Sequence, residues 1–497
     1  MSPTHLENKL NVNRVAVIGA GPCGLAAAKY LVSEKKFAKI EVFEQRSAVG
    51  GIWNYTPLNV VDREFTIPRT QPSKLPDTAI WADGVPGAQF VSPVYDFLET
   101  NIPNTLMNYS DQTFPEGSSL FPKHAVVKQY LEDYARELRP ILSLHTQVLG
   151  VEKISSGEKP CWQVETLDMD TKQKRITKFD AVIVASGHYN DPFIPDIKGL
   201  GEFNRTHPGC ISHSKFYRRP DQYKGKKVVI VGNSASGIDL SAQISAVCQQ
   251  PIIVSEKAKP VTVVEEKPWA KLLPEVSEFL PIERAVRFSD GTLEKDIDAV
   301  VFCTGYFYSF PFLKSLPSPV VTDGSYAKHL YEHILYIDDP TLSFLGIPQR
   351  VVPFPLSEVQ SGYVARLLAG RLPLPLHETM LEWESKMLKE KGESKLLHNL
   401  AFPKDVDYIN RLHDISISAK RVQGLDNDGV GKIPPYWGAD KAWARERFPL
   451  IKIASRALGE KRHEVKTLED LGFDFQAWSA AKEAEQKLTQ TRNDPSR

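Results

Sequence analysis

The sequence predicts an α/β protein built on parallel sheets. Four short apolar runs, RVAVIGAG, DAVIVASG, KVVIVGNS and DAVVFCTG, are rich in Val and Ile and lack polar alternation. Such runs are typical of strands buried on both faces of a parallel sheet. CGLAAAKYLVSEKK follows Gly21 and SASGIDLSAQISAVCQ follows Gly232, both with apolar residues at helical spacing, and the strand-like KIEVFE and PIIVSE come next. Two β-α-β starts about 210 residues apart predict two dinucleotide-binding units.

Composition excludes several classes of protein. The chain has 497 residues, which predicts two to four domains at about 150 residues each. Lys+Arg and Asp+Glu both total 61, so the net charge gives no reason to expect nucleic acid or an anionic membrane as a partner. Hydrophobic residues at 42% and charged residues at 25% are ordinary globular values and argue against disorder.

Cysteine usage and the termini predict a reducing, cytoplasmic location. The five cysteines form no CxxC pair, which argues against a disulfide scaffold and a structural zinc site; they are Cys23, Cys161, Cys210, Cys248 and Cys303. The first residues, MSPTHLENKLNVN, lack the apolar stretch of a secretory signal, and no run reaches the roughly 18 apolar residues that span a bilayer. Residues 480–497 are polar and predict a frayed helix with a disordered end.

The first glycine-rich turn predicts a pyrophosphate site. It consists of Gly19, Ala20, Gly21, Pro22, Cys23 and Gly24. Gly19 permits the tight turn, Gly21 lets the backbone approach the pyrophosphate, and Gly24 allows close helix packing, with the phosphates at the positive end of the helix. Glu44 closes the next strand about 20 residues on, where a carboxylate can bind a ribose. Cys23 could be an activated thiolate, or a small residue beside a cofactor.

A Gly-Gly pair follows the ribose-binding position. Gln45 leads to Gly51, Ile52 and Trp53, and glycines here allow the backbone to press against a flat or phosphorylated ligand. The pattern GxGxxG followed by ExxxxxGGxW resembles the FAD-binding segment of the flavin-containing monooxygenases.

The second turn resembles the NADPH-binding turn of the same family. It consists of Gly232, Asn233, Ser234, Ala235, Ser236 and Gly237, with Ser234 where the middle glycine would stand. Lys257 and Lys259, after the paired strand, could accept the 2′-phosphate of NADP, whereas Glu256 could bind the ribose diol of NAD.

A linking segment resembles the family fingerprint FxGxxxHxxx followed by an aromatic residue. Gly209, His213 and Tyr217 match, and His207 replaces the leading Phe. Baeyer–Villiger relatives typically have Trp at the last position, so Tyr217 favours oxygenation of a heteroatom. His213 could be a catalytic base, or it could orient the two domains.

The resemblance implies further cofactor contacts. Asn101 is expected to be the catalytic residue, since its amide can donate to a peroxide oxygen and hold NADP+. The other implied contacts are Thr100, Val148, Ser186, Gly187, Thr304, Gly305 and Gln360. The Pro-rich stretch of about residues 57–122 is expected to be functional or locally folded, and the segment around Gly346 to return to the flavin.

The resemblance also implies a domain order and a reaction. Residues 1–211 and 332–480 would form the FAD domain with C-terminal helices, 212–331 an inserted NADPH domain, and 481–497 a polar tail. NADPH would reduce FAD, O2 would add to give a C4a-hydroperoxyflavin, and one oxygen would pass to a nitrogen or sulfur of a small molecule. The tail lacks the membrane anchor of vertebrate members, so a soluble fungal or yeast-type member is expected, with no metal and a homodimer as the default assembly.

Other functions remain open from the sequence. A pyridine-nucleotide disulfide reductase would need the missing cysteine pair. Baeyer–Villiger oxygenation of a ketone and a non-catalytic nucleotide sensor are the remaining alternatives. Single aromatic residues could line a substrate pocket, although such residues are more often core residues; these are Trp81, Trp269, Tyr308 and Trp437.

Overall fold

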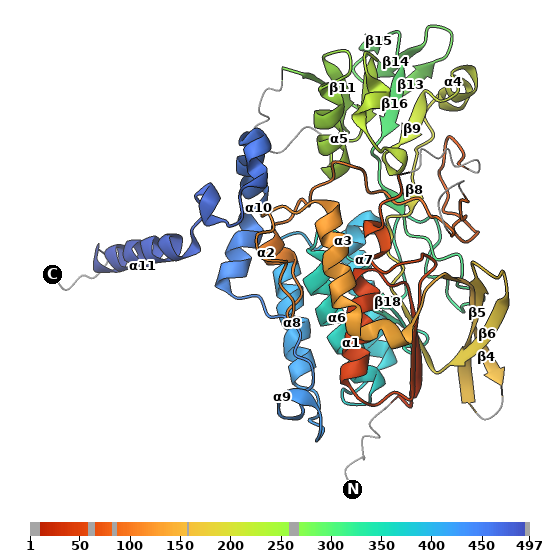
Figure 1. Ribbon diagram of the computed structural model, residues 1–497, viewed down its shortest axis with the longest axis vertical. Helices are drawn as coiled ribbons and strands as arrows, with labels where there is room; N and C mark the ends of the chain where they lie inside the picture. Colours follow the sequence, from red (N-terminus) through yellow and green to blue (C-terminus); the bar gives the residue numbers. More distant parts are fainter. Residues whose placement is uncertain (1–9, 58–64, 82–86, 157–158, 258–267, 493–497) are drawn as a thin grey trace.

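A seven-stranded sheet forms the lower half of the molecule in Figure 1. The computed structural model describes residues 10–57, 65–81, 87–156, 159–257 and 268–492. In sheet order the strands are β18 (Leu330–Tyr331), β19 (Leu335–Tyr336), β20 (Leu342–Phe344), β7 (Ala181–Val184), β1 (Arg14–Ile18), β2 (Lys39–Phe43) and β3 (Leu142–Ser143). The five strands from β20 to β3 are parallel, whereas β18 and β19 are antiparallel additions.

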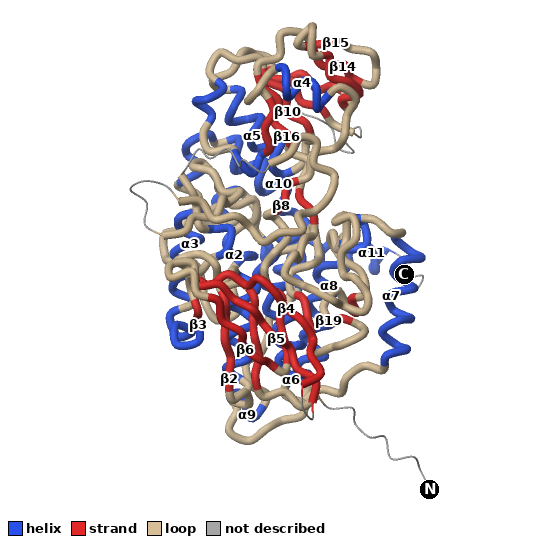
Figure 2. Tube along the Cα trace, turned by 90° about the vertical axis from the view of Figure 1, so that its right-hand side faces the viewer, coloured by secondary structure: helices blue, strands red, loops and turns tan. Residues whose placement is uncertain are grey.

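Both faces of this sheet are covered, as the unbroken apolar runs predict. Val15 and Val17 face one core with the helices α1 (Pro22–Ser33), α3 (His124–Tyr134) and α6 (Pro353–Leu368). Ala16 and Ile18 face a second core. That core is closed by an antiparallel sheet of β4 (Thr146–Ser156), β5 (Lys159–Asp168) and β6 (Lys174–Phe179), which Figure 2 shows at the front.

A five-stranded parallel sheet forms the upper part in Figure 1. Its strands in order are β12 (Ala270–Leu273), β11 (Ile252–Ser255), β10 (Val228–Val231), β16 (Ala299–Phe302) and β9 (Ile211–His213). The helix α5 (Ala235–Ser245) packs on one face. The helix α4 (Leu200–Thr206) packs on the other face, with an antiparallel sheet of β13 (Val276–Leu280), β14 (Ala285–Phe288) and β15 (Leu293–Glu294).

The chain crosses between the two sheets at a two-stranded antiparallel pair, β8 (Asp191–Pro192) with β17 (Tyr306–Phe307). After the first crossing, Ile194 and Phe203 pack in the core of the five-stranded sheet. After the second crossing, Phe310 and Phe312 pack under the seven-stranded sheet. The first crossing therefore lies before the boundary expected at residue 211, and the second before the one expected at residue 331. The division into domains stays a prediction.

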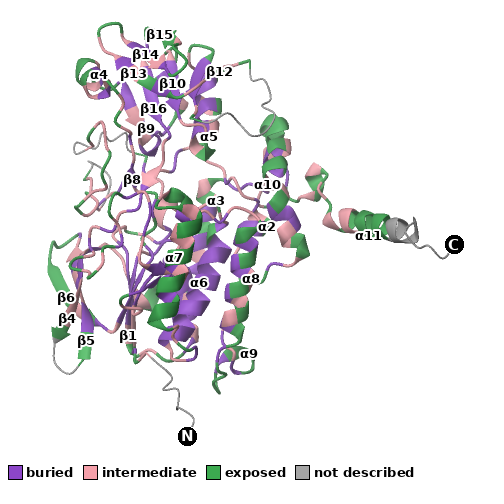
Figure 3. Ribbon diagram, turned by 180° about the vertical axis from the view of Figure 1, so that it is seen from behind, coloured by how far each residue is buried: buried purple, intermediate pink, exposed green. Residues whose placement is uncertain are grey.

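The last third of the chain is mostly helical. Its helices are α7 (His377–Lys391), α8 (Lys404–Ile417), α9 (Asp426–Gly429), α10 (Ala439–Ala457) and α11 (Phe475–Arg492). Figure 3 shows α6 buried along its length, while α7 and α11 expose much of their surface. Figure 1 shows α11 projecting away from both sheets. The sequence predicted a frayed helix with a disordered end over residues 480–497, and the chain is helical as far as Arg492. None of the helices in the described part of the chain could cross a membrane.

Candidate functional site

The first glycine turn is built so that side chains are excluded from it. Gly19 has a φ of 100°, and a Cβ on it would lie 2.7 Å from the Ala185 carbonyl oxygen. A Cβ on Gly24 would lie 1.8 Å from the Gly19 carbonyl oxygen. No side chain caps the N-terminus of α1, where Gly21 is the N-cap residue. The positive end of the helix is thus left for an anionic ligand.

Glu44 ties this turn to the end of β2. Its buried carboxylate accepts hydrogen bonds from the Ala20 backbone N–H at 3.0 Å and from the Arg46 N–H at 2.9 Å. Each carboxylate oxygen can accept a second hydrogen bond. Glu44 can therefore hold the turn and also bind a ribose hydroxyl.

The Gly-Gly pair lies directly against the first turn. Gly50 donates its N–H to the Ala20 carbonyl at 2.8 Å and begins the 3-10 helix η1 (Gly51–Trp53). A Cβ on Gly51 would lie 2.9 Å from the Gly21 Cα, so the two backbones touch. Two bare backbone segments side by side form a cradle of the kind a pyrophosphate requires, and the residues present fit FAD.

A cavity of about 730 Å³ opens from this turn. Its volume is within the range of small-molecule and cofactor sites. Fourteen of the residues assigned from the sequence line it: Gly19, Gly21, Pro22, Cys23, Glu44, Gln45, Gly51, Ile52, Trp53, Thr100, Asn101, Val148, Ser186 and Gly187. Ala20 and Gly24 belong to the turn without lining the cavity.

Asn101 stands at the apex of a small turn in the cavity wall. Thr100 donates its hydroxyl to the Ile102 carbonyl at 2.9 Å and its N–H to the Pro122 carbonyl at 3.0 Å. Within the described residues, the Asn101 side-chain amide has no hydrogen bond. The hydrogen-bonded turn therefore presents to the cavity an amide that no described residue binds.

The sequence pointed to the Pro-rich stretch and to the segment around Gly346, but it did not single out the individual residues of another cavity wall. They come mainly from the loop of residues 66–78 and from residues 188–192, 307–312 and 346–356. Gln147 connects the loop to Gln45, because its side chain donates to the Asp77 carbonyl at 2.7 Å and to Gln45 at 3.1 Å. Asp191 binds Arg69 at 2.7 Å and the Ser73 N–H at 2.6 Å. The Pro-rich composition of this stretch was the available signal.

The second glycine turn repeats the geometry of the first on the five-stranded sheet. Gly232 has a φ of 105°, and its Cβ would lie 2.7 Å from the Cys303 carbonyl oxygen. A Cβ on Gly237 would lie 1.9 Å from the Gly232 carbonyl oxygen. Ser234 is extended, with a φ of −102°, so a serine fits where the motif has glycine. The second turn therefore has the geometry that a dinucleotide-binding turn requires, and none of the residues 232–237 lines the cavity.

The acidic residue after β11 is already engaged. Asn233 donates its side-chain amide to the Glu256 carboxylate at 2.9 Å. Lys257 is exposed over 89% of its side chain and lies 3.9 Å from Glu275. The pairing of Glu256 and the exposed position of Lys257 both fit NADPH better than NADH. Lys259 lies outside the described residues.

His213 fixes the crossing between the two sheets. Its Nε2 lies 3.1 Å from the Gly305 carbonyl, and its Nδ1 accepts the Lys215 N–H at 3.1 Å. The Thr304 hydroxyl donates to the Phe193 carbonyl in the same crossing. Burial lowers the pKa of His213 to about 3, so the imidazole is neutral and both nitrogens are occupied. Of its two proposed roles, orientation of the crossing fits this geometry.

Two other predicted residues, Cys23 in the cavity wall and Gln360 next to it, have roles that the structure clarifies. Burial raises the pKa of the Cys23 thiol to about 12, which argues against an activated thiolate and for a small packing residue. Gln360 is buried in α6, accepts the Gly346 N–H at 2.8 Å and donates to the Tyr408 hydroxyl at 3.1 Å. Its amide supports a cavity-lining residue; direct contact with a cofactor stays a prediction. None of the four candidate aromatic residues lines the cavity.

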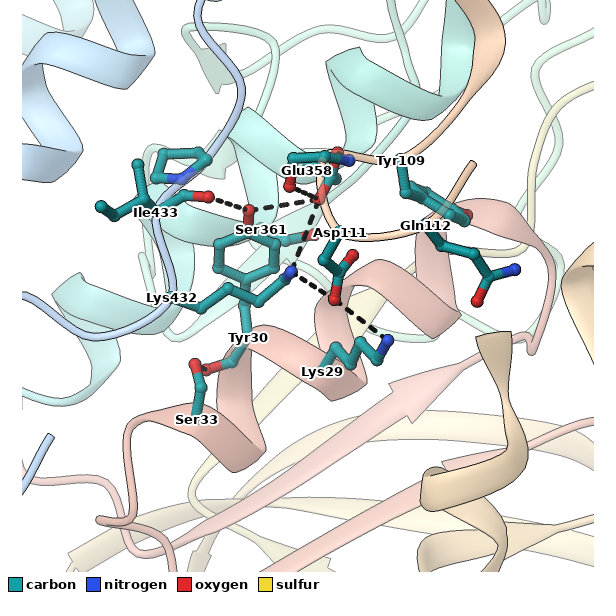
Figure 4. Close-up of polar contacts among 12 residues, drawn as sticks. Lys29, Tyr30, Ser33, Tyr109, Asp111, Gln112, Glu358, Ser361, Lys432 and Ile433 are labelled. Atoms are coloured by element: carbon teal, nitrogen blue, oxygen red, sulfur yellow. Dashed lines mark hydrogen bonds and ion pairs between the residues drawn. The ribbon is translucent and has the colours of Figure 1, made fainter. Parts of the chain in front are cut away.

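A buried polar cluster lies behind the cavity between α1 and α6 (Figure 4). Glu358 accepts hydrogen bonds from the Ser110 N–H at 2.8 Å, the Ser110 hydroxyl at 2.7 Å and the Tyr30 hydroxyl at 3.3 Å. Lys432 lies 3.9 Å from Glu358 and 2.7 Å from Asp111. Burial raises the pKa of Glu358 to about 7. The cluster does not line the cavity, and within the described ranges no His, Cys, Asp or Glu group forms a metal site.

Comparison with known proteins gives two family matches. The family described as flavin-binding monooxygenase-like matches residues 87–266 and 268–422, and an NAD(P)-binding Rossmann-like domain matches residues 17–67. The chain is 34% identical over 421 residues to flavin-containing monooxygenase FMO GS-OX5 of Arabidopsis thaliana, covering 81% of this chain and 85% of that protein.

Two further relatives extend over nearly the whole chain. Flavin-containing monooxygenase ustF2 of Aspergillus flavus is 28% identical over 494 residues, covering 88% of this chain and 97% of that protein. The structure of S-allyl-L-cysteine S-oxygenase from Allium sativum has a TM-score of 0.74 and 26% identity, and the match covers 96% of this chain and 100% of that one.

Proposed function

Since the chain belongs to the flavin-binding monooxygenase-like family, we propose that it uses FAD, NADPH and O2 to oxygenate a nitrogen or sulfur atom of a small molecule. FAD and NADPH are the cofactors of the two glycine turns. When bound, FAD supplies the oxygen chemistry, and the protein supplies binding, orientation and exclusion of water. The flavin hydroperoxide and the fungal or yeast-type subgroup stay predictions.

The proposal rests on one observation above others. Asn101 and the Gly21–Gly51 cradle line the same cavity, and the Asn101 amide has no hydrogen bond among the described residues. A neutral amide held in a rigid turn can stabilise developing charge on an oxygen and hold the nicotinamide without a change in protonation.

Sulfur is the first substrate class to test. The similar structure from Allium sativum is an S-allyl-L-cysteine S-oxygenase. Thioether sulfur is a soft nucleophile and needs no deprotonation before it accepts an oxygen atom. This chemistry fits a cavity lined by a neutral Cys23, while His213 lies outside the cavity lining and is occupied by the crossing.

The test measures where the electrons of NADPH go. With thioethers, tertiary amines and ketones as separate substrates, NADPH oxidation, hydrogen peroxide release and product mass are followed together. We expect a product one oxygen heavier from a thioether or an amine. Products only from ketones would support Baeyer–Villiger oxygenation, and NADPH that leaves the bound flavin oxidised would support a nucleotide sensor.

Asn101→Ala tests the role of the amide. We expect flavin reduction by NADPH to persist while the hydrogen peroxide fraction rises about tenfold, because one transition-state donor is lost. Asn104→Ala is the control, since the Asn104 amide donates to the Ser119 carbonyl and does not line the cavity. An equal hydrogen peroxide fraction in Asn101→Ala and the wild type would contradict the role of Asn101.

A further inference from the structure

Lys452 lies in α10, beyond residue 422, where the family match ends. Figure 1 shows α10 beside α2 (Asn104–Met107), with its upper end near α5. The C-terminal helices thus reach the segment that carries Asn101. A part of the chain outside the family match contacts the wall of the cavity.

The contact is made by a buried ammonium group. The Lys452 Nζ donates to the Thr100 carbonyl at 2.8 Å, and Lys452 is only 8% exposed. The Nζ also lies 3.8 Å from a Glu99 carboxylate oxygen and 4.1 Å from the centre of the Phe121 ring. A charge-assisted hydrogen bond out of contact with water is stronger and more directional than a neutral one.

This hydrogen bond completes the fixation of Thr100. The hydroxyl and the N–H of Thr100 are bound to the Ile102 and Pro122 carbonyls, and Lys452 binds its remaining polar group. Asn101 follows in the chain and has no side-chain hydrogen bond among the described residues. The position of the Asn101 amide therefore depends on the backbone that Lys452 holds.

Neighbouring residues of the same C-terminal segment contact the chain on either side of Asn101. Arg462 donates to both oxygens of Glu99, at 2.8 and 3.2 Å. The Leu120 N–H donates to the Val465 carbonyl at 2.8 Å. Leu120, Phe121, Ile451 and Val465 share one apolar cluster. These contacts seat α10 independently of Lys452, so loss of the ammonium need not detach the helix.

We propose that Lys452 is a positioning residue for oxygenation, which holds the Thr100 carbonyl and thereby keeps the Asn101 amide at its place in the cavity wall. The proposal rests on the proposed function, because it assigns Lys452 an effect through Asn101. It predicts that loss of Lys452 changes the fraction of NADPH oxidation that ends in hydrogen peroxide more than it changes the affinity for NADPH or substrate.

The surroundings of Lys452 predict a pH dependence. Burial lowers the pKa of Lys452 to about 8, and Glu99 opposes this effect. The charged groups around it are Glu99, Asp239, Arg456, Arg462 and, beyond Glu99, His463. As the pH rises through about 8, the ammonium loses its charge and its hydrogen bond to the Thr100 carbonyl weakens. Arginine at this position would stay charged.

The experiment compares Lys452→Met, Lys452→Arg and Lys441→Met, the last removing a lysine from the first turns of the same helix. The hydrogen peroxide fraction of NADPH oxidation is measured from pH 6.5 to 9.5 with a thioether or amine substrate. We expect the fraction to rise about threefold to tenfold in Lys452→Met at pH 7 with KM for NADPH unchanged. Lys452→Arg should return the hydrogen peroxide fraction to the wild-type value at pH 7. It should also remove the rise in this fraction that we expect for the wild type above pH 8.

A double variant separates this proposal from the proposed function. If Lys452 acts through Asn101, Asn101→Ala with Lys452→Met should be no less coupled than Asn101→Ala alone. Additive losses, or wild-type coupling in Lys452→Met, would overturn the positioning role. If neither the wild type nor any variant oxygenates a substrate, the proposed function itself fails. A lower melting temperature with unchanged coupling would mean that Lys452 only stabilises the helix.

Discussion

The backbone of Gly51 lies against that of Gly21 so closely that a Cβ on Gly51 would come within 2.9 Å of the Gly21 Cα. The two residues belong to different elements, the N-terminus of α1 and the start of η1. Their contact brings two bare backbone segments to one side of the cavity. This relationship makes the first turn sensitive to the smallest possible side chain.

Alanine substitutions should separate the two cofactor sites. Gly24→Ala forces a Cβ against the Gly19 carbonyl, and Gly237→Ala does the same at Gly232. We expect Gly24→Ala to lower the FAD content of the purified protein about tenfold or more, because the turn must open. Gly237→Ala should keep FAD and slow its reduction by NADPH.

The measurement is the flavin-to-protein absorbance ratio together with the rate of anaerobic bleaching. Gly201→Ala is the control, since a Cβ there meets only ordinary contacts. Loss of FAD in Gly237→Ala with retention in Gly24→Ala would reverse the assignment of the two turns.

Lys257 should discriminate between the two nicotinamide cofactors. Its side chain is exposed after β11, and Glu256 is engaged by Asn233. We expect Lys257→Ala to raise KM for NADPH about threefold to tenfold and to leave KM for NADH unchanged, because one exposed ion pair with the 2′-phosphate is lost. Initial rates with both cofactors measure this difference, and an equal rise for both would contradict it.

Buried histidines should make the protein acid-sensitive. Burial lowers the pKa of His213 and His398 to about 3 and that of His188 to about 4. Their stabilising contribution is present above the unfolded value of 6.5 and is lost as the pH falls toward the folded values, because the unfolded chain takes up protons first. For each histidine, the free energy of unfolding should fall by about 2 kcal/mol as the pH falls from 6.5 to 5.

Urea unfolding at several pH values measures this slope. His213→Asn should reduce the slope by about 1.4 kcal/mol per pH unit, the effect of one proton. An unchanged slope would mean that His213 takes up its proton in the folded protein too.

Glu358 should act in the opposite direction. The carboxyl group is held in the protonated form up to a pKa of about 7, against 4.5 in the unfolded chain. Its stabilising contribution is present below pH 4.5 and is lost as the pH rises to 7, by about 3 kcal/mol at most. The free energy of unfolding of Glu358→Gln should therefore rise relative to that of the wild type between pH 5 and pH 8. A difference that does not change with pH would contradict the raised pKa.

Much of the fold was predictable because the strands are buried on both faces. Val228 to Val231 and Ala181 to Val184 are fully buried strands, and their apolar runs were visible without alternation. The two glycine turns were predictable for the same reason that alanine is excluded from them. The helix ends at Pro22 and Ala235 followed from the turns.

The cavity wall was harder to predict because nothing periodic marks it. The loop of residues 66–78 contains no helix or strand, and its position depends on distant partners such as Gln147 and Asp191. Contacts between Lys452 and Thr100 join residues far apart in the chain. The Pro-rich composition marked the loop but not its position, and no local pattern marked the contact of Lys452. The crossing at His213 was visible only through the family resemblance.

The loop of residues 66–78 also bears on how such a protein can change. It lines the cavity but belongs to neither parallel sheet, and Thr70, Gln71 and Leu75 are among its lining residues. Substitutions at these positions can reshape the opening of the cavity without disturbing the strands or the glycine turns. If the proposed substrate binds in this cavity, a library confined to the loop should alter substrate preference while the flavin content of the protein is retained.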